Sequence, residues 1–238
     1  MFKLINKSIL LTAFTLFIYH SVNGQRSGGL TGANLKDHLL INDKEAVPRM
    51  DIEDVQGSRY ENDSFLLSTV ETLKDTFYNV PMRYNIFEDV IEFKDNLNQL
   101  FLLDPLMTIK KVTIDDLVLV VKPYNLDGQI KTGFFILLSD GKVNLLGKKI
   151  IKFQPLIPAK ALQYENTPAK FLNAPDQYYA RIGNNPAVLI NKLKKTIELF
   201  PDHQKSLLSF VDRRNLGKNK EDLLKLWEYY NSLTDQPN

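Results

Sequence analysis

The sequence contains no cysteine among its 238 residues and only three histidines, one of which lies in the first 24 residues. Without cysteine the protein has no disulfide, no thiolate nucleophile and no cysteine metal ligand. The other two histidines, His38 and His203, have no further histidine or carboxylate at metal-ligand spacing on a predicted helix, so we expect no metal site. The fold must therefore be stabilised by its hydrophobic core alone.

The common catalytic and nucleotide-binding motifs are also missing. Neither the hydrolase pattern G-x-S-x-G nor the phosphate-binding patterns G-x-G-x-x-G and G-x-x-x-x-G-K-[ST] occurs. Carboxylates gather at 51–54, 88–92 and 115–116, but the second and third groups fall at predicted turns. There we expect the acids to face water rather than to form the opposed pair that a glycosidase needs. The sequence predicts no catalytic residue and no cofactor.

The N-terminal residues are typical of a secretory signal. Lys3 and Lys7 precede an apolar run over 9–19, and small residues follow before Gln25. The run is about 11 residues long, shorter than the roughly 20 that a membrane-spanning helix needs, and no later segment is long and apolar enough. We therefore expect residues 1–24 to be a signal peptide, cleaved after Gly24, and the protein to be exported without a membrane span.

The charge of the chain changes when this segment is removed. Residues 1–24 contain two lysines and no acid, so the remaining 214 residues have 28 basic and 28 acidic side chains. Basic residues in the C-terminal region are also interleaved with acids. A protein that binds nucleic acid needs a concentrated positive field, so we expect no nucleic-acid partner.

The rest of the chain divides by composition. Residues 25–63 are rich in Gly, Asn and Asp with few apolar residues, and predict an extended arm. Residues 64–238 predict a single domain, β-rich over 64–183 and helical over 184–233. Short strands separated by short turns indicate an antiparallel meander, sandwich- or barrel-like, so the predicted fold class is α+β.

Two predicted hairpins support this fold class. In 78–93 apolar residues recur at every second position, and a turn at 88–89 would place Ile86 opposite Ile91 with all large apolar side chains on one face. Because Pro81 has no amide hydrogen, we expect its strand to lie at an edge of the sheet. This apolar face is interpreted as part of the core rather than as the lining of a ligand site.

The second hairpin, at 133–153, has the favoured turn pair Asp140-Gly141 and is apolar on both faces, which predicts a central position with Leu138 opposite Val143.

Towards the C-terminus the residues that end and start secondary-structure elements change. Prolines recur between 155 and 175 and predict a surface connection, followed by a short strand in QYYARIG. Asn185-Pro186 is a typical helix start, so we expect a helix over 187–200, a second over 203–214 ended by Gly217, and a third from Asn219. The C-terminal segment should therefore contain about three helices.

Several segments together resemble a family of exported proteins of Bacteroidetes to which no activity is assigned. They are VQGSRY, NVPMRYNIFEDVIEFKD, SDGKVNLLGKK, YYARIGN and KEDLLKLWEYYNSL. The resemblance covers about 35–233 and implies export to the periplasm or cell surface of a Gram-negative bacterium. It implies no active-site residue.

With no catalytic motif, a balanced charge and many tyrosines, the sequence favours a non-enzymatic envelope protein that binds another envelope component, a protein or a glycan. Two alternatives remain open: a hydrolase that acts on glycan or lipid, and a carrier of a small apolar ligand. Exposed tyrosines can stack on sugars or anchor a partner, and at most one tyrosine of each adjacent pair is needed by the core. The candidate interaction residues are Tyr60, Arg83, Tyr178, Tyr179 and Tyr229.

Overall fold

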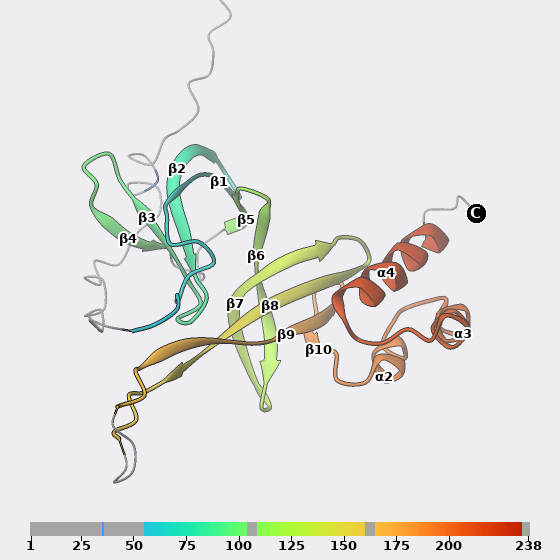
Figure 1. Ribbon diagram of the computed structural model, residues 1–238. Helices are drawn as coiled ribbons and strands as arrows, with labels where there is room; N and C mark the ends of the chain where they lie inside the picture. The colour runs from blue at the N-terminus through green and yellow to red at the C-terminus, as the bar shows by residue number, and fades with distance from the viewer. Residues whose placement is uncertain (1–34, 36–54, 104–108, 160–164, 235–238) are drawn as a thin grey trace, which may run out of the picture.

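The computed structural model describes residues 35, 55–103, 109–159 and 165–234. The predicted signal peptide and most of the predicted arm lie outside these residues. The strands are β1 (Leu66–Thr72), β2 (Thr76–Asn85), β3 (Val90–Lys94), β4 (Leu100–Leu103), β5 (Ile109–Ile114), β6 (Leu117–Leu126), β7 (Gln129–Ser139), β8 (Val143–Gln154), β9 (Lys170–Ile182) and β10 (Val188–Leu189). The helices are α2 (Leu193–Ile197), α3 (Gln204–Arg214) and α4 (Lys220–Thr234), and Figure 1 shows their arrangement.

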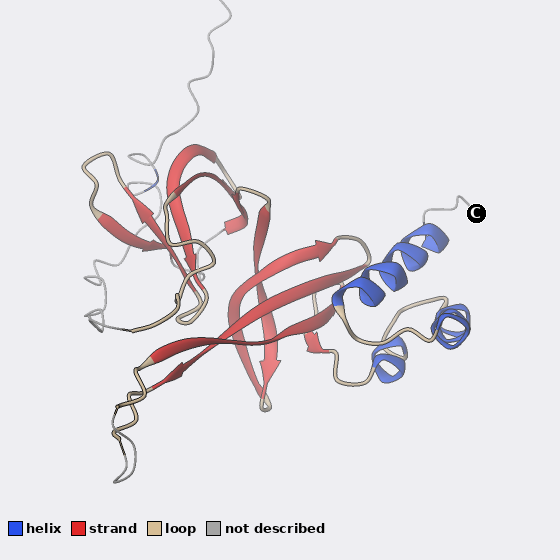
Figure 2. Ribbon diagram, viewed as in Figure 1, coloured by secondary structure: helices blue, strands red, loops and turns tan. Residues whose placement is uncertain are grey.

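The strands form one antiparallel sheet in the order β10-β9-β8-β7-β6-β5-β1-β2-β3-β4. Strands β5 to β10 are consecutive neighbours, as are β1 to β4, and the chain crosses from β4 back to place β5 beside β1. Figure 2 shows the sheet bending strongly between β5 and β6, with all three helices at the far end. This confirms the predicted α+β class, the meander and the three C-terminal helices.

The part of the sheet from β6 to β10, called here the closed half, curls until its two sides meet. Ala187, just before β10, donates its amide to Pro123 O at 2.8 Å and accepts from Asn125 N at 3.2 Å. These bonds join the start of β10 to β6, so the closed half is barrel-like. The strands β1 to β5 are called the open half.

Three buried clusters stabilise the molecule. The first fills the open half and includes Phe77, Ile91 and Phe93. The second lies between the outer face of β8 and β9 and the helices, around Trp227. The third fills the interior of the closed half with side chains from every strand or its flank: Val120, Tyr124, Phe135, Leu146, Tyr179 and Ala187.

The first hairpin has the predicted faces but not the predicted register. Tyr84 lies opposite Ile91, two residues away from the expected pairing, because the turn contains four residues, 86–89. Asn85 Oδ1 accepts from Glu88 N at 3.1 Å, and Asp89 adopts a left-handed conformation with φ of 55°. A shift by two residues preserves which side chains are buried, so the alternating pattern alone does not distinguish the two registers.

The second hairpin differs in the same way. Leu137 lies opposite Leu146, and the ladder is irregular between Leu137 and Ser139 rather than pairing Leu138 with Val143. Asp140 Oδ1 accepts from Gly141 N at 2.9 Å and from Asn144 Nδ2 at 2.6 Å, which holds a wider loop than a two-residue turn. The central position is confirmed, since β7 and β8 are flanked on both sides and apolar residues on both faces are buried.

The proline-based predictions were wrong in two places. β2 is not an edge strand, because it lies between β1 and β3, but its pairing with β3 extends only to Met82, one residue after Pro81. Residues 170–175 are not a surface connection, since they belong to β9. Pro175 is tolerated there because the β8–β9 register is irregular between Lys148 and Ile150, where Pro175 lies opposite.

The first C-terminal helix is much shorter than expected. Residues 187–190 do not form a helix, because Val188 and Leu189 pair with Ala180 and Tyr179 of β9. The helix α2 begins only at Leu193. Asn-Pro signals a turn as well as a helix start, and tertiary pairing decided between the two. The other two helices are confirmed, although α3 ends at Arg214 with Asn215 in the left-handed conformation, before Gly217. The helix α4 follows Asn219, whose Oδ1 accepts from Asp222 N at 2.9 Å.

Candidate functional site

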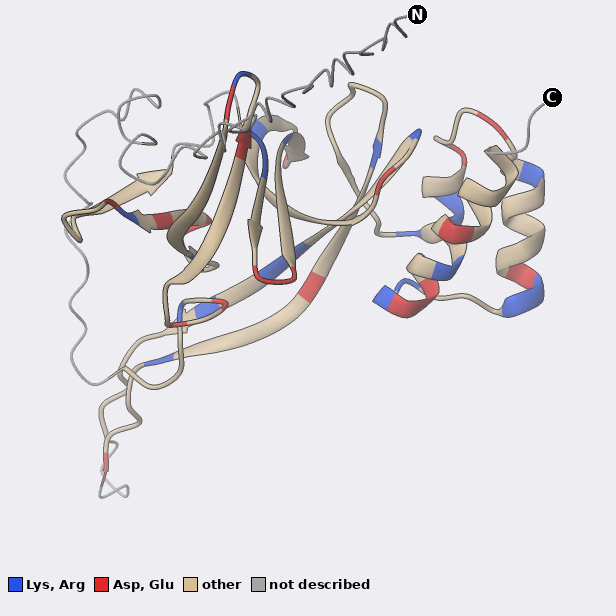
Figure 3. Ribbon diagram, turned by 90° about the horizontal axis from the view of Figure 1, so that it is seen from above, with Lys and Arg blue, Asp and Glu red and all other residues tan. Residues whose placement is uncertain are grey.

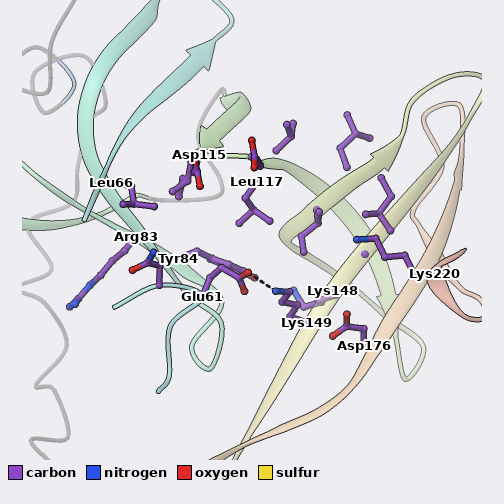
Figure 4. A pocket seen from close by; sticks show the side chains of 18 of the residues that line it. Glu61, Leu66, Arg83, Tyr84, Asp115, Leu117, Lys148, Lys149, Asp176 and Lys220 are labelled. Carbon is purple, nitrogen blue, oxygen red and sulfur yellow. Dashed lines mark hydrogen bonds and ion pairs between the residues drawn. The ribbon is translucent and has the colours of Figure 1, made fainter. Parts of the chain in front are cut away.

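A cleft of about 560 Å³ lies between the two halves of the sheet and the start of α4. Its apolar wall comes from distant parts of the chain: Leu66 in β1, Ile114 and Leu117 in the β5–β6 hairpin, Ile136 and Leu138 in β7, and Leu224 in α4. Figure 4 shows the labelled side chains around this space, with Leu66 and Asp115 on one side and Lys220 on the other. The bend of the sheet therefore brings together residues that no local pattern connects.

A glycine deepens the cleft. Gly147 lies in the middle of β8, opposite Ile136, and lines the cleft. A Cβ atom at this position would lie 3.1 Å from Leu138 Cδ1, which is a tight contact. The absence of a side chain at Gly147 leaves room between the strands for Leu138 and keeps the apolar wall continuous.

Charged groups surround the apolar wall. Lys149 forms an ion pair with Glu61, drawn as the dashed line in Figure 4, which connects β8 to the segment before β1. Four further charged side chains line the cleft: Asp115, Asp116, Asp176 and Lys220. They are exposed, and within the described part of the chain they form no ion pair with one another or with other groups. The cleft therefore offers charges of both signs beside an apolar surface.

Two of the candidate interaction residues, Tyr60 and Arg83, contact each other beside the cleft. The Arg83 guanidinium lies over the Tyr60 ring, with Cζ 3.8 Å from the ring centroid, and donates to Tyr60 Oη at 2.8 Å. Arg83 also forms an ion pair with the buried Glu92 at 2.7 Å and donates to Asp63 O at 2.9 Å. This cluster holds the segment before β1 onto β2 and β3, and Arg83 also lines the cleft.

The three other candidate tyrosines lie in different places. Tyr178 is half-buried, packs near the helices and lines the cleft, and burial together with Asp176 raises the pKa of its hydroxyl. Tyr179 is a core residue with 2% of its surface exposed, and burial raises its pKa to about 12. Tyr229 stacks on Phe210 on the α3–α4 face, with ring centroids 4.2 Å apart, away from the cleft. Only Arg83 and Tyr178 therefore belong to the cleft itself.

A buried polar cluster lies under the cleft. Tyr84 Oη donates to Asp89 Oδ1 at 2.6 Å, and Lys148 Nζ donates to Asp89 Oδ2 at 2.6 Å and to Phe134 O at 3.2 Å. Burial, followed by the charge of Asp89, raises the pKa of Tyr84 well above its usual value, so the hydroxyl stays protonated. The cluster connects the β2–β3 turn of the open half to β7 and β8 of the closed half.

The structure corrects the expectation that the acids of 88–92 face water for two of the three, since Glu88 is exposed as expected but Asp89 and Glu92 are not. Glu92 lies within β3, is 3% exposed and is held by Arg83. Asp89 is held by Tyr84 and Lys148, as described above. A turn composition predicts solvent exposure only for side chains that no distant strand contacts, and here β7 and β8 contact Asp89.

Sequence reasoning missed most of the cleft. Leu117, Lys149, Asp176 and Lys220 carried no signal, because their neighbours in sequence read as ordinary strand, turn and helix residues. Within the described ranges, no group of three or more His, Asp or Glu side chains is placed to hold a metal ion. Among the same residues, every helix is too short or too polar to cross a membrane.

No protein-family model, no curated protein and no solved structure matches this chain. The resemblance to exported Bacteroidetes proteins therefore stays a prediction.

Proposed function

We propose that this protein is a non-enzymatic, exported envelope protein that binds another envelope component in the cleft between the two halves of its sheet. The observation that carries the proposal is the cleft itself, which combines an apolar wall with charges of both signs that form no ion pair among the described residues. A volume of about 560 Å³ falls within the range of typical ligand-binding sites.

The chemistry of the cleft favours a segment of a protein over a glycan. An extended peptide presents apolar and charged side chains in alternation, which suits Leu117 and Leu138 beside Asp115 and Lys220. Glycan sites rely on exposed aromatic rings, and of the two cleft tyrosines Tyr84 is buried, so only Tyr178 offers a partly accessible ring.

The two alternative functions have less support. A carrier needs an apolar cavity, but the interior of the closed half is filled by Tyr124, Phe135 and Tyr179, whose ring centroids lie 5.1 to 5.9 Å apart. A hydrolase needs available carboxylates, but the two most enclosed acids near the cleft, Asp89 and Glu92, are engaged by Lys148 and Arg83.

Site-specific photocrosslinking in the native host tests the binding site. The crosslinker benzoylphenylalanine replaces Leu117 or Leu224 in the cleft, or Leu199, which is 47% exposed and does not line the cleft, as a matched control. We expect a discrete adduct from both cleft positions, and a lower yield after Lys220→Glu, because a partner in the cleft lies within reach of each probe. Equal labelling at Leu199, or no adduct at the cleft positions, would contradict the proposal.

Export is tested separately by intact mass and N-terminal analysis of the protein from the same cells. We expect the chain to begin at Gln25, because the residues before it have the composition of a signal peptide. Retention of residues 1–24 would contradict the proposed export to the envelope but would not affect the proposed binding in the cleft.

A further inference from the structure

Two basic side chains share the interior face of the closed half. Along β6, Val120 and Tyr124 point into the third buried cluster, and Lys122 lies between them on the same face because side chains alternate along a strand. Along β9, Tyr179 points into the same cluster, and Arg181 follows two residues later on that face. The neighbouring Ala180 belongs instead to the outer face, which the helices cover.

The topology brings these two residues close together. The rings of Tyr124 and Tyr179 contact across the interior, with centroids 5.9 Å apart. β6 and β9 run antiparallel, since each neighbouring pair from β6 to β9 is antiparallel. Lys122 precedes Tyr124 by two residues, and Arg181 follows Tyr179 by two residues. Both therefore lie towards the same end of the interior, where β8 begins. Arg181 lies opposite Asn144 of β8 in the same register.

Neither of the two cations forms an ion pair with another described residue. Arg181 Nε has no accessible surface and no hydrogen-bond acceptor. Burial lowers the pKa of Arg181, and burial followed by the charge of Arg181 lowers the pKa of Lys122. The charge of Asp140 offsets only part of the lowering of the Lys122 pKa. The Asp140 carboxylate already accepts hydrogen bonds from Gly141 N and Asn144 Nδ2.

Two other partly buried cations among the described residues are paired. Arg83 binds Glu92 and Lys148 binds Asp89, each within 2.7 Å, and both pairs have further hydrogen bonds. Placing like charges together in a partly buried site is unfavourable unless an opposite charge joins them. The chain from Gln25 onwards has no net charge, so this pair of cations is a local feature rather than part of a generally basic surface, and Figure 3 shows basic and acidic residues interspersed over strands and helices.

We propose that Lys122 and Arg181 form an oxyanion-binding site at the end of the closed half where β8 begins, and that the site takes a phosphate group. A guanidinium donates two parallel hydrogen bonds to phosphate oxygens, and the ammonium group supplies a second charge beside it. The site is separate from the cleft, because neither residue lines the cleft.

Thermal unfolding in sodium phosphate, compared with sodium chloride at equal ionic strength, tests this site. We expect phosphate to raise the Tm of the wild-type protein, and Arg181→Met or Lys122→Met to weaken phosphate binding by about tenfold or more. Lys152→Met is the matched control, because Lys152 is an exposed lysine of β8. It should respond to phosphate as the wild type does.

The same variants provide a second readout without phosphate. Removal of one of two partly buried like charges should raise the Tm in chloride, so Arg181→Met is expected to melt at a higher temperature than the wild type. If Arg181→Met does not fold, Lys122→Met gives the same comparison. An equal response of the wild type to phosphate and chloride, or an unchanged phosphate response in both variants, would overturn the proposal.

Two sources of the phosphate group are distinguished by comparing inorganic phosphate with glycerol 1-phosphate, which represents a lipid or polymer headgroup. Tighter binding of the ester supports the site with a headgroup as its ligand, and tighter binding of inorganic phosphate supports it with the free ion. No response to either compound counts against an oxyanion site.

Discussion

The Tyr84–Asp89–Lys148 cluster shows how single residues hold the two halves of the sheet in place. Asp89 adopts a left-handed conformation at the end of the β2–β3 turn, which aims its carboxylate at β7 and β8. Lys148 Nζ also lies over the rings of Tyr124 and Phe135, at 5.4 and 5.0 Å from their centroids. The carboxylate fits because Gly133 of β7 has no side chain.

Substitution Gly133→Ala is therefore expected to destabilise the protein by about 1–3 kcal/mol, in the range of other overpacking substitutions. The new Cβ atom would lie 2.6 Å from Asp89 Oδ2 and 3.3 Å from Lys148 Nζ, so the ion pair must move. Urea unfolding measures the change. Gly217→Ala is the control, because its Cβ atom would meet nothing closer than 3.5 Å. Equal stability of the two variants would show that the cluster tolerates displacement.

At the scale of elements, helix α4 is defined by its first turn. Asp222 Oδ2 accepts from Gly217 N and Asn219 Nδ2, both at 2.9 Å, and Asp222 Oδ1 accepts from Lys225 Nζ at 3.3 Å. The hydrogen bond from Gly217 N is the main cause that lowers the pKa of Asp222 below its usual value of 3.8. The carboxylate thus joins the loop after α3 to the start of α4.

This contact makes a specific prediction for pH dependence. Because the pKa of Asp222 is lower in the folded protein than in the unfolded chain, its contribution is complete above pH 3.8 and is lost as the pH falls through the folded-state pKa. The Tm difference between wild type and Asp222→Asn should therefore be constant from neutral pH to about pH 4 and shrink below it. A difference that stays constant down to about pH 2 would contradict the assignment.

At the scale of the whole molecule, β8 connects the three buried clusters. Ile151 belongs to the cluster of the open half, Leu145 to the cluster under the helices and Leu146 to the interior of the closed half. Trp227 of α4 donates from Nε1 to Val143 O at 2.9 Å at the start of the same strand. A substitution that disrupts the packing of the helices is therefore expected to destabilise the sheet as well.

The substitution Trp227→Ala tests this connection. Removing this fully buried side chain should cost about 3–5 kcal/mol, with the loss of packing against Phe200 as a main cause. Urea unfolding followed by far-UV and by tyrosine near-UV circular dichroism should give coincident transitions, both at lower urea than in the wild type. Separate transitions, with only the helical signal shifted, would show that the helices and sheet unfold independently.

Local physics determined most of the elements. Alternation placed Tyr84, Ile91 and Phe93 on one buried face, and the cap at Asn219 defined the start of α4, because both signals depend on neighbours within a few residues. The α+β class and the meander followed from the same local patterns. Balanced charge and the missing motifs likewise come from composition, which folding does not change.

Tertiary structure decided the strand register, which turn residues are buried, and where the two proposed binding sites form. A two-residue slip of the hairpin keeps the same faces buried, so only the actual turn distinguished the registers. The pairing of Val188 with β9 overrode a helix signal, and β7 and β8 enclosed Asp89 in a turn that was expected to face water. The cleft and the Lys122–Arg181 pair depend on strands that are far apart in sequence. Their chemistry arises only when the sheet bends and closes, which no local pattern encodes.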